Sequence, residues 1–203
     1  MRALLLPVLL IPLWAGAAEE RVVRLVPLGD VEPALLDAVS AAISARVNAK
    51  VEIAPREELP SEAFYKPRKR WRAEKLLQFL ESKANGAWRV VGVTNQEIST
   101  TKGAYPDWGI AGLGTIGGPS CVVSAFLYKK YSKTKPLMLC RFADCGVHEL
   151  GHTLGMPHCE TKGCVMADAK GNAIKSSDES SGEYCEPCRK LAPEGSLKPA
   201  PER

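Results

Sequence analysis

Residues 148–158 read HELGHTLGMPH, the pattern H-E-x-x-H-x-x-G-x-x-H, and contain all three histidines of the chain. Residues four apart on a helix lie on one face, so His148 and His152 can direct their rings at a single metal ion. Gly155 can adopt the left-handed conformation that ends a helix, and the resulting turn would bring His158 back as a third ligand. The spacing therefore predicts a helix that ends at a three-histidine metal site.

Three nitrogen ligands leave the fourth position of a tetrahedral zinc ion open, which distinguishes a catalytic zinc site from a structural one. Zinc lowers the pKa of a bound water to about 7, so a nucleophile is present at neutral pH. Glu149 follows the first ligand and can take the proton of that water as general base. The segment predicts hydrolysis of peptide bonds. The alternative is a catalytically idle zinc-binding interaction module. The carboxylate of Glu149 argues against this alternative, because a purely structural zinc site does not need a carboxylate there.

The composition limits the possible classes of protein. The chain has 203 residues, 45% apolar content and a formal net charge of +4, which suits one compact domain or two subdomains that share a core. A collagen-like, low-complexity or wholly disordered chain is excluded. The small charge gives no dominant basic face, so no nucleic-acid partner is expected. The basic run KPRKRWR at 66–72 is interpreted as a solvated loop rather than a nucleic-acid or membrane-surface patch.

Apolar periodicity predicts alternating strands and helices. Leu35, Val39 and Ile43 follow one another at intervals of four, which indicates one apolar stripe on a helix. The order of the elements implies an α/β layer with a mixed sheet. The Gly-rich region 102–119 should be irregular and lie at a sheet edge. The predicted strands cover 21–28, 51–53, 88–93 and 120–127, the predicted helices cover 33–47 and 71–84, and 161–183 is predicted to be irregular.

Cysteines follow directly after the third histidine. Four residues separate Cys159 from Cys164, Met166 comes two positions later, and Cys185 and Cys188 form a C-x-x-C pair. This run resembles the archaemetzincin family of metzincin metallopeptidases, whose histidine motif continues as C-x4-C-x-M, a spacer of about seventeen residues and C-x-x-C. The spacer is one residue longer here. Weaker family signatures match at 65–77 (YKPRKRWRAEKLL), 90–94 (VVGVT) and 121–124 (CVVS).

The resemblance implies a fold, a substrate class and a role for each motif residue. It implies an α/β (α+β), metzincin-like zincin fold with a mixed twisted sheet, two backing helices, an active-site helix and a small irregular C-terminal subdomain. It implies two Zn²⁺ ions per chain and a peptide or protein substrate, and we expect a monomer. Met166 would form the turn below the metal. The assigned ligands are His148, His152 and His158 for the catalytic zinc ion, with Glu149 as base, and Cys159, Cys164, Cys185 and Cys188 for a structural zinc ion.

The resemblance also bears on substrate binding. Residues 108–114 (WGIAGLG) resemble the family's edge strand, which pairs antiparallel with a bound peptide, and the glycines would let the substrate backbone approach closely. An ordinary Gly-rich loop is the alternative. The polar stretch 167–184 would border the pocket for the side chain after the scissile bond. Some metzincins place a tyrosine two residues after the turn methionine to assist the oxyanion, but Asp168 occupies that position here.

The redox state of the seven cysteines is open from sequence alone. An exported chain meets oxidising conditions, in which cysteine pairs usually form disulfides, so two disulfides are the alternative to the four-thiolate zinc site. The remaining three cysteines are an odd set. We expect Cys121 to pair with Cys140 and Cys145 to stay free, although three pairings are possible.

Residues 1–18 show the three parts of a secretory signal peptide: a basic start, an apolar run and an A-x-A site. The apolar run is shorter than the roughly 20 residues that a membrane-spanning helix needs, so no stable membrane insertion is expected after cleavage. We therefore predict an exported protein, periplasmic or secreted. The predicted division is a signal peptide at 1–18, an N-terminal subdomain at 19–155 that ends in the active-site helix, a C-terminal subdomain at 156–192 with the Met166 turn and the four-cysteine site, and a disordered tail at 193–203.

Overall fold

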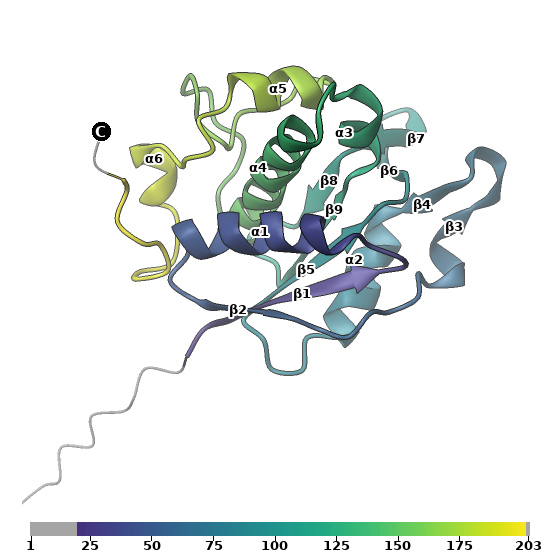
Figure 1. The fold of residues 1–203 in the computed structure, drawn as a ribbon, viewed down its shortest axis with the longest axis horizontal. Coiled ribbons are helices and arrows are strands. Elements are labelled where there is room, and N and C mark those ends of the chain that lie inside the picture. Colours follow the sequence, from purple (N-terminus) through teal and green to yellow (C-terminus); the bar gives the residue numbers. More distant parts are fainter. Residues whose placement is uncertain (1–19, 202–203) are drawn as a thin grey trace, which may run out of the picture.

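The structure is a computed structural model that describes residues 20–201, so the predicted leader at 1–18 lies outside the described residues. The central sheet has five strands (Figure 1), and only the last of them in the sheet order is antiparallel to its neighbour. The mixed sheet predicted from the sequence is confirmed. In sheet order the strands are β2 (Lys50–Ile53), β1 (Val22–Leu28), β5 (Arg89–Thr94), β9 (Ser120–Ser124) and β8 (Gly112–Gly114).

Helices cover both faces of this sheet (Figure 1). Alternate residues of β1 explain the arrangement, because Val23 and Leu25 belong to one hydrophobic cluster and Val26 belongs to the other. Parallel strands buried on both faces need such continuous apolar runs. The first cluster includes residues of α1 (Pro33–Arg46), α3 (Phe126–Tyr131), α4 (Lys135–Thr153) and α6 (Glu186–Arg189), and the second includes residues of α2 (Ala73–Ser82).

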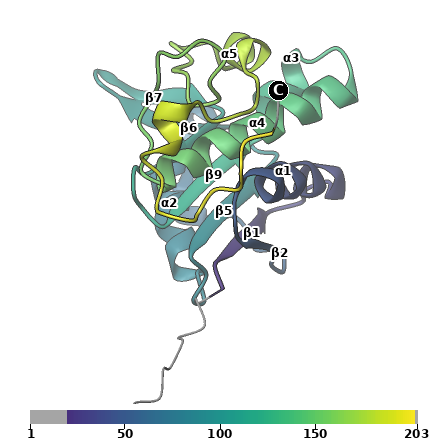
Figure 2. The same cartoon turned by 90° about the vertical axis from the view of Figure 1, so that its left-hand side faces the viewer.

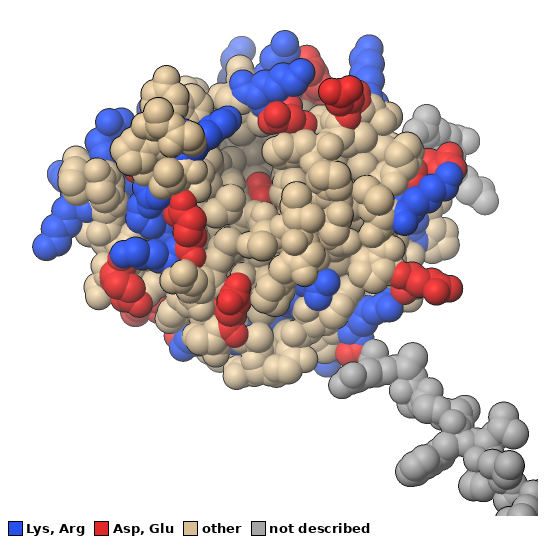
Figure 3. Space-filling model, turned by 180° about the vertical axis from the view of Figure 1, so that it is seen from behind, with Lys and Arg blue, Asp and Glu red and all other residues tan. Residues whose placement is uncertain are grey.

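A second, smaller sheet lies beside the first. It contains β3 (Phe64–Tyr65), β4 (Arg70–Arg72), β6 (Ile98–Lys102) and β7 (Tyr105–Ile110), with two 3-10 turns at Ser61–Ala63 and Lys66–Arg68. The basic run at 66–72 lies here, and its arginines have acidic partners. Arg70 bonds to Glu97 at 2.8 Å and to Asp107 at 3.1 Å. Figure 3 shows Lys and Arg interspersed with Asp and Glu on one face of the molecule.

The predicted edge strand at 108–114 is divided between the two sheets. Residues 108–110 belong to β7, whereas Gly112–Gly114 form β8 at the edge of the central sheet. The glycines of this stretch also have a different role from the predicted close contact with a substrate backbone. A Cβ atom at Gly112 would lie 2.5 Å from Cγ of Glu149, and one at Gly114 would lie 2.4 Å from the backbone oxygen of Glu149. These glycines let β8 approach α4 closely.

Two expectations about secondary structure are wrong in detail. The strand predicted over 120–127 ends at Ser124, because the Ser124 hydroxyl accepts the backbone N–H of Phe126 at 3.1 Å where α3 begins. A short helix, α5 (Ala173–Glu179), interrupts the predicted irregular region, and the side chain of Asn172 caps it by accepting the N–H of Lys175 at 3.0 Å. Local side-chain capping of this kind is a helix-start signal.

The predicted disordered tail is wrong for its first part. Figure 2 shows the C-terminal segment passing alongside α1. The N–H of Lys198 donates to the carbonyl of Arg46 at 2.9 Å, and the N–H of Asn48 donates to the carbonyl of Ser196 at 2.7 Å. Leu197 forms a bridge with Val47, and Ser196 is buried. The segment is held by backbone pairing, which its proline content does not prevent at these positions.

No helix within residues 20–201 combines the length and the apolar character needed to cross a bilayer.

The contact between β8 and α4 gives a test of the fold. We expect Gly114→Ala to lower the free energy of unfolding by about 1–3 kcal/mol, because the new methyl group overlaps the backbone of α4. Gly109→Ala is the matched control, because a Cβ atom there would lie 3.7 Å from its nearest neighbour, Arg70. Urea unfolding of both variants measures the difference. Equal stability of the two variants would contradict the close approach.

Candidate active site and metal centres

Helix α4 places His148 and His152 side by side, and their Nε2 atoms lie 3.1 Å apart. Each ring is oriented by a backbone carbonyl. Nδ1 of His148 donates to the carbonyl of Val165 at 2.7 Å, and Nδ1 of His152 donates to the carbonyl of Met156 at 2.8 Å. A proton on Nδ1 leaves the lone pair on Nε2 free for a metal. The two hydrogen bonds therefore direct both Nε2 atoms at the same point.

His158 lies next to the other two histidines, as the spacing predicts. Gly155 has a φ of 94°, in the left-handed region, and the chain turns there after the end of α4. The ligand nitrogens of His148, His152 and His158 all lie within 4.8 Å of one another. Nitrogens about 2.0–2.1 Å from a shared zinc ion would have to lie this close together. The residues present fit a zinc ion with three nitrogen ligands.

Burial favours the neutral form of the two histidines on α4. It lowers the pKa of His148 to about 4 and also lowers the pKa of His152. Burial raises the pKa of Glu149 to about 8, and a backbone hydrogen bond with Gly114 opposes this shift. A divalent cation nearby favours the carboxylate form and works in the same direction as that hydrogen bond. Binding of a metal would therefore favour the ionised form of Glu149.

Met166 is fully buried and packs on α4 at Gly151, and its place in the turn below the metal stays a prediction. A Cβ atom at Gly151 would lie 2.4 Å from the sulfur of Met166 and 2.9 Å from the ring of Tyr184. The Tyr184 hydroxyl donates to the carbonyl of Val147 at 2.7 Å. Gly151 thus lets this part of the C-terminal subdomain pack directly on α4. The sequence analysis did not identify Gly151 or Tyr184, although a glycine inside a helix usually has a packing reason.

The four C-terminal cysteines also converge, with all four sulfur atoms within 4.8 Å of one another. Sγ of Cys159 lies 3.6 Å from Sγ of Cys185, and Sγ of Cys164 lies 3.8 Å from Sγ of Cys188. A disulfide needs about 2.05 Å, whereas sulfurs at the corners of a tetrahedral zinc site with bonds of about 2.3 Å lie about 3.8 Å apart. The cluster fits a four-thiolate zinc site.

Hydrogen bonds favour the thiolate form of Cys159, whereas burial raises the pKa of Cys164 and of Cys188. The N–H of Thr161 donates to Sγ of Cys159 at 3.3 Å, and the N–H of Cys185 donates to Sγ of Cys164 at 3.4 Å. The hydrogen bonds from Thr161 lower the pKa of Cys159 to about 7. Donors aimed at sulfur favour its charged form, which is the form that binds a metal.

The other cysteines do not pair as expected. All seven cysteines have free thiols in the structure, so the predicted Cys121–Cys140 disulfide is not formed. Cys121 is buried in the core on β9, whereas Cys140 is exposed on α4. Cys145 is buried, and burial raises its pKa well above the usual range. Burial raises the pKa of all three thiols, and Cys121 and Cys145 pack in the core.

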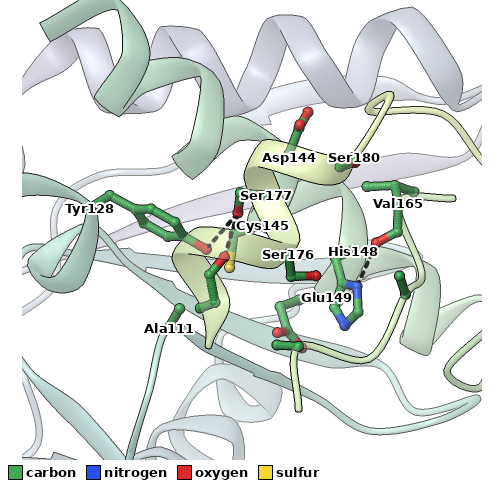
Figure 4. Close-up of a pocket in the computed structure, with 13 residues that line it drawn as sticks. Ala111, Tyr128, Asp144, Cys145, His148, Glu149, Val165, Ser176, Ser177 and Ser180 are labelled. Atoms are coloured by element: carbon green, nitrogen blue, oxygen red, sulfur yellow. Dashed lines mark hydrogen bonds between the residues drawn. The ribbon is translucent and has the colours of Figure 1, made fainter. Parts of the chain in front are cut away.

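A pocket extends from the histidine site along α4 (Figure 4). Helix α5 forms one wall of the pocket. Arg141 holds that helix by a bidentate ion pair with Asp178, in which Nε donates to Oδ1 at 2.7 Å and Nη2 donates to Oδ2 at 2.6 Å. Tyr128 and Ser177 meet in the pocket with their hydroxyl oxygens 3.4 Å apart. The stretch 167–184 borders the pocket, as expected. No sequence motif identified Tyr128 or Arg141, because only the tertiary fold brings them to the site.

Asp168, which stands at the position of the tyrosine of some metzincins, lies near the histidines. Its Oδ1 accepts the N–H of Lys170 at 2.9 Å, and this hydrogen bond lowers the pKa of Asp168. A carboxylate held in its charged form cannot donate a hydrogen bond to an oxyanion. Asp168 therefore does not replace the tyrosine.

Comparison with known proteins agrees with this geometry. A model of peptidase family M54 matches residues 34–192. The chain belongs to this family, the archaemetzincins. The archaemetzincin of Haloquadratum walsbyi is 26% identical over 83% of this chain and 98% of its own length. An archaemetzincin of Saccharolobus islandicus is 30% identical over 66% of this chain and 71% of its own length.

Solved structures show the same fold. The crystal structure of archaemetzincin from Methanopyrus kandleri superposes with a TM-score of 0.73 at 26% identity and covers 90% of this chain and 96% of its own. The crystal structure of archaemetzincin from Archaeoglobus fulgidus, complexed with malonate, superposes with a TM-score of 0.71 at 24% identity. It covers 84% of this chain and 99% of its own. The predicted zincin-like fold and archaemetzincin family are confirmed, and the chain is a zinc metallopeptidase.

Proposed function

We propose that the chain hydrolyses peptide bonds at the three-histidine site with Glu149 as general base. The observation that carries this proposal is the convergence of His148, His152 and His158 beside a buried carboxylate. A bound zinc ion supplies a Lewis acid and lowers the pKa of water to about 7. Glu149 then accepts a proton from the attacking water and passes it to the leaving amine.

The free edge of the central sheet supports binding of an extended peptide. Strand β8 (Gly112–Gly114) is the last strand of that sheet, and its inner face packs against α4 directly at Glu149. A peptide that adds to such an edge pairs with its backbone groups and lies antiparallel or parallel to the strand. We propose that β8 positions the substrate backbone next to Glu149. The glycines contribute by bringing the strand close to α4.

Replacement of Glu149 tests the general base. We expect Glu149→Gln to lower kcat by about 10²–10⁴ while the zinc content stays unchanged, because the imidazoles alone hold the ion. Glu58→Gln, which removes an exposed acid outside both ligand groups, is the matched control and should retain full activity. Peptide cleavage followed by mass spectrometry, together with metal analysis, measures both quantities. Unchanged cleavage by Glu149→Gln refutes the role of Glu149, and no cleavage by the unaltered protein supports the idle binding module.

We also propose that the four cysteines hold a second, structural zinc ion. The sulfur separations of 3.6 Å and 3.8 Å support this over two disulfides. Metal analysis should find two zinc ions per chain, one for each ligand group, and Cys164→Ser should reduce this to one. Cys140→Ser, which changes an exposed cysteine outside the cluster, should keep both ions. One zinc ion per chain with only three reactive thiols would instead indicate two disulfides.

Export is a further proposal, supported by the sequence pattern at 1–18. We expect the mature protein to begin after Ala17 or Ala18 and to be recovered outside the cytoplasm. Intact-mass measurement of the protein from cell fractions tests this. A chain that keeps residues 1–18 and stays in the cytoplasmic fraction would contradict it. The expectation of a monomer stays a prediction.

A further inference from the structure

The pocket beside the active site has a defined shape. The volume of the pocket between α4, α5 and the loop at 165–169, including its opening to solvent, is about 410 Å³. His148 and Glu149 lie at one end of the lining, and Asp144 lies one helical turn away along α4 (Figure 4). Four residues of helix rise about 6 Å, which is similar to the length of an extended lysine stem. A side chain of this length that enters beside His148 therefore spans the distance to the turn of α4 that carries Asp144.

The lining of the pocket carries acidic and hydroxyl groups. Its residues include no lysine and no arginine. Its apolar walls come from small residues, which leave room for an alkyl stem, while hydroxyls of α5 and Tyr128 can bond to a cationic head. The polar lining residues are Tyr128, Asp144, Cys145, His148, Glu149, Ser176, Ser177 and Ser180.

Within the described part of the chain Asp144 forms no ion pair, although the Arg46 guanidinium lies near its carboxylate on the side of Gly182. The nearest guanidinium is that of Arg46, which is already bonded to Glu183 at 2.9 Å and to the carbonyls of Gly182 and Ala42. Glu183 is the other charged group that faces Asp144. Arg141, on the same helix, is paired with Asp178. Burial raises the pKa of Asp144 to about 6 and the nearby Arg46 guanidinium opposes this shift, so the carboxylate is ionised and only partly compensated at neutral pH.

We propose that this pocket selects a lysine or arginine side chain directly after the scissile bond and that Asp144 is the residue that determines this specificity. The proposal rests on the peptidase function proposed above. The substrate cation supplies the partner that Asp144 lacks, and a charge-assisted hydrogen bond inside a partly buried pocket is stronger than one at the surface. An acidic side chain is rejected, because Asp144 and Glu149 would repel it.

Binding of a lysine side-chain mimic tests the pocket without catalysis. The zinc-loaded protein is titrated with n-butylammonium, with n-butanol as the uncharged counterpart, and amide signals are followed by NMR. We expect n-butylammonium to shift the signals of Asp144 and Ser177, and Asp144→Asn to weaken this binding about tenfold. Asp37→Asn, which removes an exposed carboxylate on α1, is the matched control and should bind normally. Equal binding by Asp144→Asn and the unaltered protein overturns the proposal.

Cleavage specificity gives the second readout. Bonds cut in a peptide library are mapped by mass spectrometry, and one cleaved peptide is made with either lysine or norleucine after the scissile bond. We expect kcat/KM to favour lysine about tenfold, and Asp144→Asn to remove the preference while the norleucine peptide is still cleaved. Cleavage without such a preference overturns the proposal. Binding of n-butylammonium without any cleavage would uphold the pocket and refute the peptidase function instead.

Discussion

The hydrogen bonds between two histidine rings and two backbone carbonyls determine whether this protein has an active site. His148 and His152 can share one ion only if both Nδ1 atoms carry their protons, and the carbonyls of Val165 and Met156 enforce this. Both carbonyls belong to the chain that follows α4. The helix alone therefore does not make the site, because the segment that follows α4 must pack on it. Gly151 allows that packing, since Met166 and Tyr184 occupy the space that a side chain there would take.

The sequence predicted the parts of the protein whose signal is local. A fixed spacing of histidines, a glycine at a helix end and an apolar stripe each follow from the geometry of a single helix. The sequence therefore predicts the convergence of the three histidines and most strands and helices. The four cysteines could be identified as one group only through the resemblance to a family. Their choice between zinc and disulfides depends on sulfur distances, which spacing does not contain.

The features that sequence reasoning missed depend on contacts between distant segments. The glycines of β8 were interpreted as facing a substrate, but they face α4, because the strand crosses the helix at Glu149. The C-terminal segment was predicted to be disordered from its prolines, but its backbone pairs with the end of α1. The acidic pocket at Asp144 has no motif at all, since its walls come from α3, α4 and α5. Each of these three features can be predicted only when the segment that packs beside it in space is known.

The two ligand clusters share their backbone. Cys159 follows His158 directly, and Cys164 precedes Val165, whose carbonyl orients His148. The N–H of Cys159 also donates to the carbonyl of Met166 at 2.9 Å. Closing the 3.6 Å gap between Cys159 and Cys185 to a disulfide bond would pull on the same peptide unit that carries His158. The position of His158 is thus tied to the spacing of the four sulfur atoms.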